Sequence, residues 1–431
     1  MYQKNEYFHA LKVKPENCTG CTACVKVCPT EAIRIRNNKI ELDELRCIDC
    51  GRCIEACSFN AIVPYYDSLD AIKKFKHKIA VFSTAYAGQF SEENDYGTIK
   101  KTILHMGFDE VAEESSVSQF MSDIIKQYIN DHKDIRPIIS SGCPAVVRLI
   151  QVRFPSLLPN LLHIEAPMST LSYYLREKAK EKYGYSDEDI GLFLIVPCVS
   201  QVTAVHQPEG TYKSYQDGAI AISEIFAQAQ DHIKEVWNDP EPIDTYKSGL
   251  TWGIASIESD NIDCEDFRSL SVSGIDNVID VLSRVEDHHL DQYQYIVLRS
   301  CTIGCVGGGL NVENPFVAQG RLKRMSKEGN YREMDYSEFR RLFNEGKFNV
   351  PKLKPRSIMQ LDSDLFAALE KVQKIDKIME VLPGINCCAC GSPNCYALAE
   401  DIVQGKATID DCVILYKYKL IRESKETLEK K

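Results

Sequence analysis

Residues 295–310 read YIVLRSCTIGCVGGGL, an apolar segment that runs into two cysteines and then into three consecutive glycines. A short apolar run of this kind, followed by turn residues, predicts a buried strand. Glycines allow close backbone approach and unusual dihedral angles beside a bulky group. We therefore expect Cys301 and Cys305 to lie at the end of a strand, in a loop shaped for a ligand.

The middle of the chain alternates apolar runs with amphipathic stretches. The apolar runs predict buried strands at residues 78–85, 136–141, 192–197, 251–256 and 295–300. Residues 118–131 and 168–184 have the periodicity of helices. Alternating strands and helices predict parallel sheets. We expect residues 310–380 to form a linker into a last domain.

Two more of the predicted strands run directly into cysteines, Cys143 and Cys198. Ligands of open α/β sheets bind at the carboxyl ends of strands. Cys143, Cys198, Cys301 and Cys305 are therefore expected to converge on one buried metal site, although they lie far apart in the sequence. Four unrelated core cysteines are the alternative, because free cysteine is among the most buried residue types.

A repeat near the N-terminus has the spacing C-x2-C-x2-C-x3-C twice. Its cysteines are Cys18, Cys21, Cys24 and Cys28, then Cys47, Cys50, Cys53 and Cys57. In ferredoxins with two [4Fe–4S] clusters, the fourth cysteine of each run ligates the other cluster. We therefore expect Cys57 to complete the first set of ligands and Cys28 the second. Structural zinc is the weaker alternative, because zinc sites favour paired C-x2-C knuckles.

A fourth group of cysteines lies near the C-terminus, with the spacing C-x2-C-x4-C-x16-C. Its members are Cys387, Cys390, Cys395 and Cys412. Four thiolates are what one [4Fe–4S] cluster needs, so the chain is expected to hold four such clusters. Residues 396–407 predict a helix between the last two cysteines. Cys388 and Cys264 are expected to be ordinary residues rather than ligands.

The composition is typical of a soluble globular protein with two or three domains, since 44% of the 431 residues are hydrophobic and 26% are charged. A net charge of −11 argues against nucleic acid as the main partner. No signal peptide is visible, and no apolar run reaches the roughly 18–20 residues of a membrane span. Eighteen cysteines in so long a chain indicate metal ligation in a reducing cytoplasm rather than disulfides.

The cysteine motifs of the middle domain resemble the signatures of the [FeFe], or iron-only, hydrogenases. The family usually has TSCCP, MPCxxK and MACxxGCxxGGG, and this chain has SSGCP at 140–144, VPCVSQ at 196–201 and SCTIGCVGGG at 300–309. GFDEVAEE (107–114) and FPSLLPNLL (154–162) are also similar to that family, and the likeness covers roughly residues 15–330. The C-terminal segment 382–412 resembles a small [4Fe–4S] domain that is found in subunits of the corrinoid/acetyl-CoA pathway and in the sensory branch of these enzymes.

The resemblance implies roles for the scattered cysteines and for the residues beside them. Cys143, Cys198, Cys301 and Cys305 would hold a [4Fe–4S] cubane, and Cys305 would bridge it to a diiron unit with CO, cyanide and azadithiolate ligands. Val196 replaces the methionine of MPCxxK. Four further departures are expected to alter the surroundings of the cluster: Gly142 replaces a proton-relay cysteine, Gln201 a lysine that hydrogen-bonds a cyanide, Arg299 a methionine, and Ala166 a serine of the proton path. The helical stretch SQFMSDIIKQYI (118–129) offers only Asp123 where acidic relay residues are usual.

The missing proton relay bears on the expected activity. General acid–base catalysis contributes about 10²–10⁴-fold to a rate, so the resemblance implies a slow ferredoxin-type [FeFe] hydrogenase. It would interconvert H2 with protons and electrons in an H2-sensing or regulatory role. The alternative is a multi-cluster electron-transfer protein that keeps the cubane and lacks the diiron unit. Expected partners are ferredoxin or a signalling protein, and the maturation proteins that build the diiron unit.

The sequence thus predicts an α/β protein of three domains. Residues 1–70 are expected to form an α+β ferredoxin-like domain, and residues 75–350 an α/β domain with parallel sheets in two lobes. Residues 351–431 are expected to form a small, mainly helical Fe–S domain. Its last helix, residues 413–431, is either a solvated terminal helix or a docking or homodimer contact. No nucleic-acid or membrane partner is expected.

Overall fold

The computed structural model describes residues 7–91, 93–210, 214–237, 249–262, 267–328, 332, 334–356, 361–362 and 364–429. The chain divides into two compact units. The larger unit takes residues 1–10, 48–51 and 65–355, and the smaller takes residues 11–47, 52–64 and 356–431. The smaller unit thus combines most of the ferredoxin repeat with the C-terminal segment, and the three-domain boundaries stay a prediction. Cys264 lies outside the described residues.

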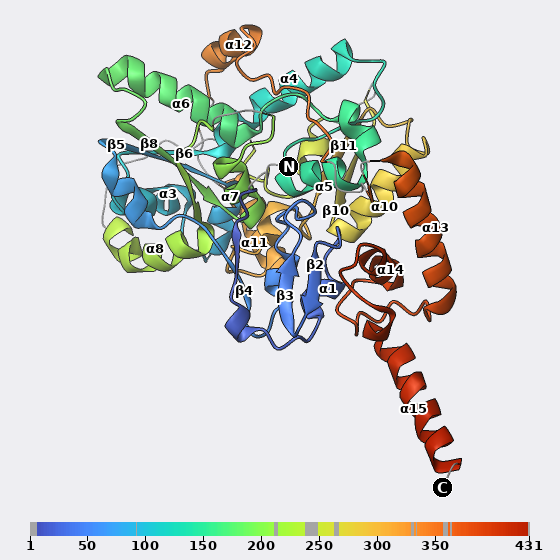
Figure 1. Ribbon diagram of the computed structural model, residues 1–431. Helices are drawn as coiled ribbons and strands as arrows, with labels where there is room; N and C mark the ends of the chain where they lie inside the picture. The colour runs from blue at the N-terminus through green and yellow to red at the C-terminus, as the bar shows by residue number, and fades with distance from the viewer. Residues whose placement is uncertain are drawn as a thin grey trace. The chain divides into compact units, whose positions relative to one another are not determined.

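Four parallel strands form the first sheet of the larger unit, in the order β6–β5–β8–β9. They are β5 (His77–Phe82), β6 (Glu110–Glu113), β8 (Ile190–Val196) and β9 (Gly218–Ala221). Helix α6 (Pro167–Tyr183) covers one face, and helices α3 (Tyr96–His105) and α8 (Ile222–Trp237) cover the other (Figure 1). Because the strand order reverses between β5 and β8, a crevice forms at their carboxyl ends.

Three parallel strands form the second sheet of the larger unit, in the order β10–β11–β7. They are β7 (Ile138–Ile139), β10 (Ser269–Ser273) and β11 (Tyr295–Arg299). Helix α10 (Ile275–Glu286) packs on β10 and β11 with its apolar side. Two parallel sheets in one unit confirm the predicted two-lobed α/β architecture.

The remaining helices of the larger unit can be compared with those predicted from the sequence. They are α4 (Ser118–Asp131), α5 (Pro144–Arg153), α7 (Val199–His206), α9 (Ile257–Asp260), α11 (Pro315–Glu328) and α12 (Ser337–Asn344). Helices α4 and α6 confirm the predictions for 118–131 and 168–184. The linker predicted at 310–380 is wrong, because α11 and α12 fold into this unit. Phe339 of α12, for example, is fully buried with its ring centroid 5.6 Å from that of Phe120.

The strand predicted at residues 251–256 is also wrong. This segment is a series of turns with a single bridge between Ile254 and Gly304. Trp252 and Ile254 are nevertheless buried. The apolar character of the segment therefore reflects burial in a loop, which periodicity cannot distinguish from a short buried strand.

The ferredoxin part of the smaller unit contains two antiparallel strand pairs. Strand β1 (Leu11–Val13) pairs with β4 (Ile62–Pro64), and β2 (Ile33–Arg36) pairs with β3 (Lys39–Leu42). Short helices α1 (Ala23–Lys26) and α2 (Arg52–Glu55) lie within the two cysteine runs. The backbone N–H of Ala32 donates to Cys28 Sγ and that of Ala61 to Cys57 Sγ, each at 3.2 Å. The two halves of the sequence repeat are thus repeated in the structure.

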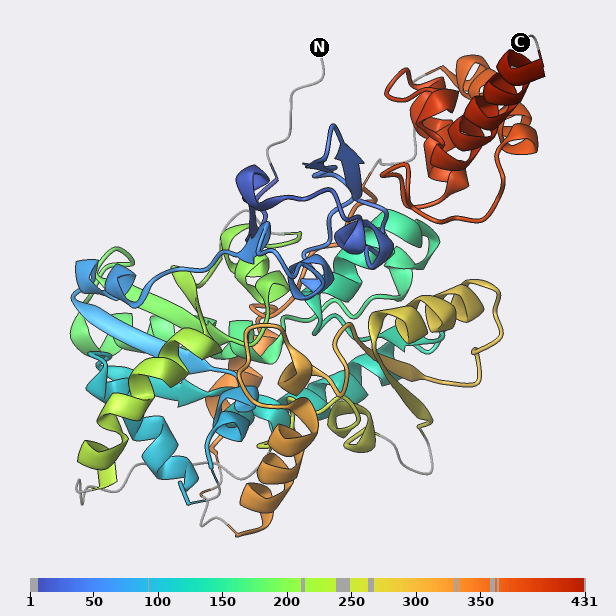
Figure 2. The same cartoon turned by 90° about the horizontal axis from the view of Figure 1, so that it is seen from below.

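The C-terminal part of the smaller unit is helical, with α13 (Leu365–Val381), α14 (Cys395–Val403) and α15 (Val413–Glu429) (orange to red in Figure 2). Helix α13 packs on α14, whereas α15 extends away from both (Figure 1). It packs on strand β2, where Ile35 N–H donates to Gly391 O at 2.8 Å. Asp401 accepts hydrogen bonds from Arg34 Nε at 2.8 Å and Arg36 Nη2 at 2.6 Å. No helix among the described residues has the length and apolar content needed to cross a membrane.

Candidate functional site

Four cysteines of the larger unit line one small cavity together with Gly142, Gly304 and Gly308. Cys143 immediately precedes helix α5, and Cys198 immediately precedes helix α7. Cys301 and Cys305 follow strand β11. The structure therefore brings together four thiols that are distant in sequence, at the carboxyl ends of β7, β8 and β11.

The environment of these thiols fits a metal cluster. Burial raises the pKa of Cys198, Cys301 and Cys305, and the neighbouring thiols of the set raise it further. Four thiolates in such a place are unfavourable on their own, whereas metal coordination deprotonates a thiol outright. Four converging cysteine sulfurs are the donor set of a [4Fe–4S] cluster.

Two of the four cysteine sulfurs have a serine hydroxyl nearby, and a glycine of the cavity lining is closely packed. Cys198 Sγ lies 3.2 Å from Ser200 Oγ, and Cys143 Sγ lies 3.6 Å from Ser300 Oγ. Hydrogen bonds to cluster sulfurs are one way in which proteins set reduction potentials. A Cβ atom added to Gly308 would lie 2.3 Å from a carbonyl oxygen of the neighbouring loop. The glycine allows this close approach of the two loops that carry Cys198 and Cys305.

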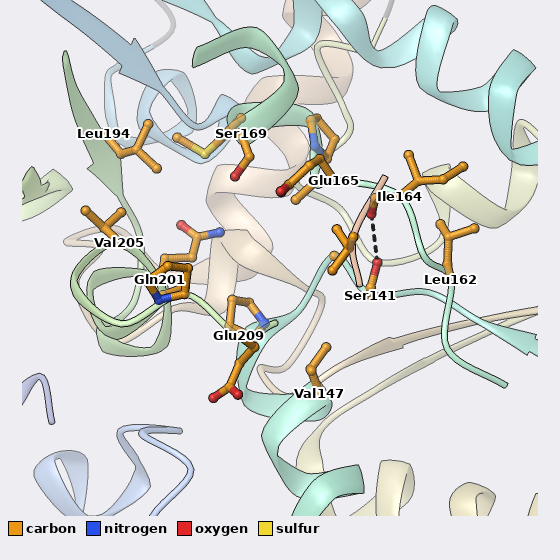
Figure 3. A pocket seen from close by; sticks show the side chains of 18 of the residues that line it. Ser141, Val147, Leu162, Ile164, Glu165, Ser169, Leu194, Gln201, Val205 and Glu209 are labelled. Atoms are coloured by element: carbon orange, nitrogen blue, oxygen red, sulfur yellow. Dashed lines mark hydrogen bonds between the residues drawn. The ribbon is translucent and has the colours of Figure 1, made fainter. Parts of the chain in front are cut away.

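A second cavity, of about 150 Å³, lies beyond Cys305 (Figure 3). The residues that line both cavities include Gly142, Gln201, Arg299 and Cys305. Ala166 lines the second cavity, so all four positions whose departure is expected to alter the surroundings of the cluster face it. Gln201 of helix α7 and Glu165 reach into this cavity from different sides (Figure 3).

Arg299 occupies the space beside Gly142. A Cβ atom added to Gly142 would lie 2.7 Å from Arg299 Nη1, so a larger side chain has no room while the guanidinium stays there. The guanidinium is buried and pairs with the buried Glu258. Glu258 also accepts hydrogen bonds from Tyr295 Oη at 2.5 Å and from Ser140 Oγ at 2.7 Å. Burial opposes the charge of Arg299, but Glu258 and the nearby thiols raise its pKa above the ordinary value.

Three residues of the second cavity were not found from the sequence: Glu114, Glu165 and Trp252. The carboxylate of Glu114 accepts hydrogen bonds from Ser83 Oγ at 3.0 Å and Thr84 N–H at 3.2 Å, and burial raises its pKa. Burial also raises the pKa of Glu165, to about 7. No local motif marks these residues, because only the fold brings them to Cys305.

Asp123, the one acid in the helical stretch 118–129, lies elsewhere. Its carboxylate pairs with Arg340 at 2.7 Å and is partly exposed. It lines neither of the two cavities. Ala166, in contrast, caps the start of helix α6 at the cavity wall. Of the positions discussed for a proton path, the structure therefore keeps Ala166 and Gly142 near Cys305 and leaves Asp123 away from it.

The cysteines of the first ferredoxin set lie close together. Burial raises the pKa of Cys24 to about 11, and the thiols of Cys57, Cys21 and Cys18 contribute to the increase. Cys57 thus lies beside three cysteines of the other run, as crossed ligation requires. Of the second set, Cys47 and Cys53 are buried in the ferredoxin core, and Cys28 packs against it. Cys50 belongs to segment 48–51 of the larger unit.

The C-terminal cysteines divide into a cluster-like set and one outlier. Cys395 and Cys412 are buried in one core, Cys390 packs against it, and Cys387 is exposed. Cys388 is buried instead in the ferredoxin core. Its Sγ lies 2.9 Å from Pro393 O. Cys388 therefore packs in a different core from the one that holds Cys395 and Cys412.

Comparison with known families identifies three regions. The family described as "Iron only hydrogenase large subunit, C-terminal domain" matches residues 76–232. A 4Fe-4S dicluster domain matches residues 10–58, and an Fe-S cluster family matches residues 382–414. The three matches follow the order expected from the cysteine groups.

Individual relatives are distant. The chain is 20% identical over 242 residues to the NADP-reducing hydrogenase subunit HndD of Solidesulfovibrio fructosivorans, covering 48% of this chain and 41% of that protein. It is 24% identical over 219 residues to the cytosolic Fe-S cluster assembly factor NAR1 of Candida dubliniensis, covering 45% of this chain and 37% of that protein. The chain thus spans about two-fifths of the length of these curated relatives.

The fold is similar to that of solved [FeFe]-hydrogenases. For HydA(deltaEFG) the TM-score is 0.52 at 13% identity, over 67% of this chain and 98% of that chain. At this identity the likeness shows the fold alone. Residues 76–232 thus match the iron-only hydrogenase large-subunit family, and the chain is an iron–sulfur protein with a match to a dicluster 4Fe-4S domain before them and to a further Fe-S domain after them.

Proposed function

We propose that the chain is a slow [FeFe] hydrogenase of the sensory branch, which interconverts H2 with two protons and two electrons in an H2-sensing or regulatory role. It would hold four [4Fe–4S] clusters and a diiron unit with CO, cyanide and azadithiolate ligands. The ligand sets are Cys18, Cys21, Cys24 and Cys57; Cys28, Cys47, Cys50 and Cys53; Cys143, Cys198, Cys301 and Cys305; and Cys387, Cys390, Cys395 and Cys412. When bound, the diiron unit supplies the centre at which H2 is split.

The observation that carries this proposal is the position of Cys305. Of the four cysteines in the site, it is the one that lines both the four-thiol cavity and the second cavity. A thiolate sulfur can ligate metal on both sides, so Cys305 is suited to link a cubane to a second metal unit. The second cavity of about 150 Å³ offers room on the far side of that sulfur.

Within this proposal, Glu165 holds an exchangeable proton in the cavity that Gly142 also lines. Its carboxyl group has a pKa raised by burial to about 7, and Ser169 hydrogen-bonds to it. A group that titrates near the working pH is the most effective general acid or base. Glu165 precedes Ala166 in the sequence and faces the same cavity as Gly142. Glu165 would take over one step of the proton relay that lacks its cysteine at position 142. One such group in place of a full relay is consistent with slow turnover.

The clusters of the smaller unit would exchange electrons with a redox partner such as ferredoxin or with a signalling protein. Maturation proteins would supply the diiron unit in a reducing cytoplasm, with no nucleic-acid or membrane partner. The terminal helix α15 exposes Tyr416 and Leu420, which is compatible with a docking or homodimer contact.

Infrared spectroscopy tests the proposal directly. The protein with intact clusters would be incubated anaerobically with a synthetic diiron precursor, desalted, and examined in the region of CO and cyanide stretching. Retained CO and cyanide bands that change under H2 are expected. Absence of these bands after incubation would rule out the hydrogenase proposal.

A second candidate is a multi-cluster electron-transfer protein without the diiron unit. The pairing of Arg299 with Glu258 favours it, because this pair takes the space beside Gly142 where a proton relay would stand. This candidate predicts full occupancy of the iron–sulfur clusters and reversible reduction by dithionite. It also predicts that no CO or cyanide band remains after incubation with the precursor.

A further inference from the structure

A buried indole N–H from the lining of the second cavity, which Cys305 also lines, has no hydrogen-bond partner among the residues that the structure describes. Trp252 is 3% exposed, and its Nε1 is buried and unpaired. An indole nitrogen is a donor only, and buried tryptophans usually find an acceptor for it. Leaving a buried donor unsatisfied costs about 1–3 kcal/mol. Because Trp252 also lines the second cavity, its unpaired N–H is a candidate donor to a ligand bound there.

The backbone around Trp252 holds this donor firmly at the cavity wall. Trp252 N–H donates to Gly249 O at 2.7 Å, and Gly253 N–H donates to Thr84 Oγ1 at 2.9 Å. A Cβ atom added to Gly253 would lie 3.8 Å from the Cβ atom of Cys305, so the loop runs directly beside this cysteine. These hydrogen bonds fix the backbone that carries the indole, in a loop beside Cys305.

The other polar groups of the same wall define what kind of ligand fits. Gln201 Oε1 is also buried without a partner, and the oxygen and nitrogen of an amide exchange places by a flip. Arg299 contributes further N–H donors, and its guanidinium is paired with the carboxylate of Glu258. A cationic guanidinium, an indole N–H and an amide together favour a small anionic acceptor.

We propose that Trp252 Nε1–H donates a hydrogen bond to an anionic diatomic ligand of the diiron unit, a cyanide, on the far side of Cys305. Together with the guanidinium of Arg299, it supplies N–H donors in place of a lysine at position 201. This inference rests on the proposed function, because it requires the diiron unit. Trp252 is in this view a ligand-positioning residue, and it does not carry protons.

The matched variants are Trp252→Phe and Trp237→Phe, each of which replaces one of the two tryptophans of the chain. Trp237 is 54% exposed and its Nε1 bonds Asn94 Oδ1 at 3.1 Å, so its replacement controls for the loss of an indole far from Cys305. Each protein would be loaded with the synthetic diiron precursor and its infrared spectrum recorded. At least one cyanide band should shift by more than its width in Trp252→Phe and stay unchanged in Trp237→Phe.

A second measurement observes the indole itself and does not depend on the stability of Trp252→Phe. The Trp237→Phe protein contains Trp252 as its sole tryptophan, so ultraviolet resonance Raman spectra report on this ring alone. Loading should shift the indole vibration that is sensitive to N–H hydrogen bonding. If the wild type loads but neither the cyanide bands nor the indole vibration shift, the role of Trp252 is refuted and the proposed function survives. If the wild type retains no CO or cyanide bands, both are refuted.

Discussion

The two sides of Cys305 differ in how closely they follow the hydrogenase-like motifs. On one side, all four cysteines stand at motif positions and line a single cavity. On the other side, Gly142, Gln201, Arg299 and Ala166 all depart from the motifs and face a second cavity. The departures are coupled in space, because Arg299 fills the volume beside Gly142. The four cysteine ligands are thus kept, whereas the residues around the second cavity differ from the family motifs.

The largest effect is expected from Cys305→Ala, because Cys305 belongs to both sides. The variant should lose about four of roughly sixteen irons per chain and all precursor-derived infrared bands. Iron analysis and infrared spectra measure both losses. Cys388→Ala is the control, since the Cys388 side chain lies in the ferredoxin core. Full iron content and normal bands in Cys305→Ala would refute the idea that the two sides meet at this sulfur.

The next largest effect is expected on the rate of H2 oxidation when Gly142 and Arg299 are changed together. Gly142→Cys alone should leave H2 oxidation within about twofold of the wild type, because Arg299 Nη1 obstructs the new side chain. Combining Gly142→Cys with Arg299→Met and Glu258→Gln should raise the rate by about tenfold or more, within the range of general acid–base catalysis. Dye-coupled H2 uptake measures the rates, with Arg299→Met/Glu258→Gln as the reference. A large increase in Gly142→Cys alone would show that Arg299 does not block the position.

A smaller effect is expected on stability from Glu258→Gln. It leaves the buried guanidinium of Arg299 without its counter-charge, which costs about 3–5 kcal/mol. The thermal midpoint should fall by about 10 °C for a unit of this size. Asp280→Asn is the control, because Asp280 pairs with Arg284 at the surface, and such pairs contribute about 0–1 kcal/mol. Equal midpoints for the two variants would contradict a structural role for the buried pair.

The smallest effect is a pH dependence. Glu165 has a folded-state pKa of about 7 against an ordinary value of 4.5, so the folded protein binds the extra proton between these values. Stability should therefore fall as the pH rises through this window and remain lower above it. Glu165→Gln should match the wild type near pH 4 and be more stable at pH 8 by about 3 kcal/mol. Denaturant unfolding at both pH values tests this, with the exposed Glu181→Gln as control.

Much of the fold could be predicted from the local spacing of residues in the sequence. The cysteine runs defined the ferredoxin repeat, and the period of residues 118–131 and 168–184 defined helices α4 and α6. The strands before Cys143, Cys198 and Cys301 also followed from short apolar runs. These features depend on neighbours in the sequence, which is why the pattern was sufficient.

The remainder of the site depends on distant contacts. Trp252 lies in a segment that was predicted as a strand and is a buried loop. Glu258, which neutralises Arg299, lies on a short helix with no motif of its own. An arginine at the end of an apolar strand does signal a buried counter-charge, but nothing in the sequence says which acid supplies it. Composition alone likewise could not separate helices α11 and α12 from a linker.

The contact between Ile35 and Gly391 has a consequence for biosynthesis. Strand β2 emerges from the ribosome about 350 residues before the segment that covers its free edge. At roughly 5–20 residues per second, that edge and the pocket later filled by Cys388 stay open for tens of seconds. The ferredoxin half is therefore accessible to cluster-inserting factors during translation, and arrival of the last segment closes it.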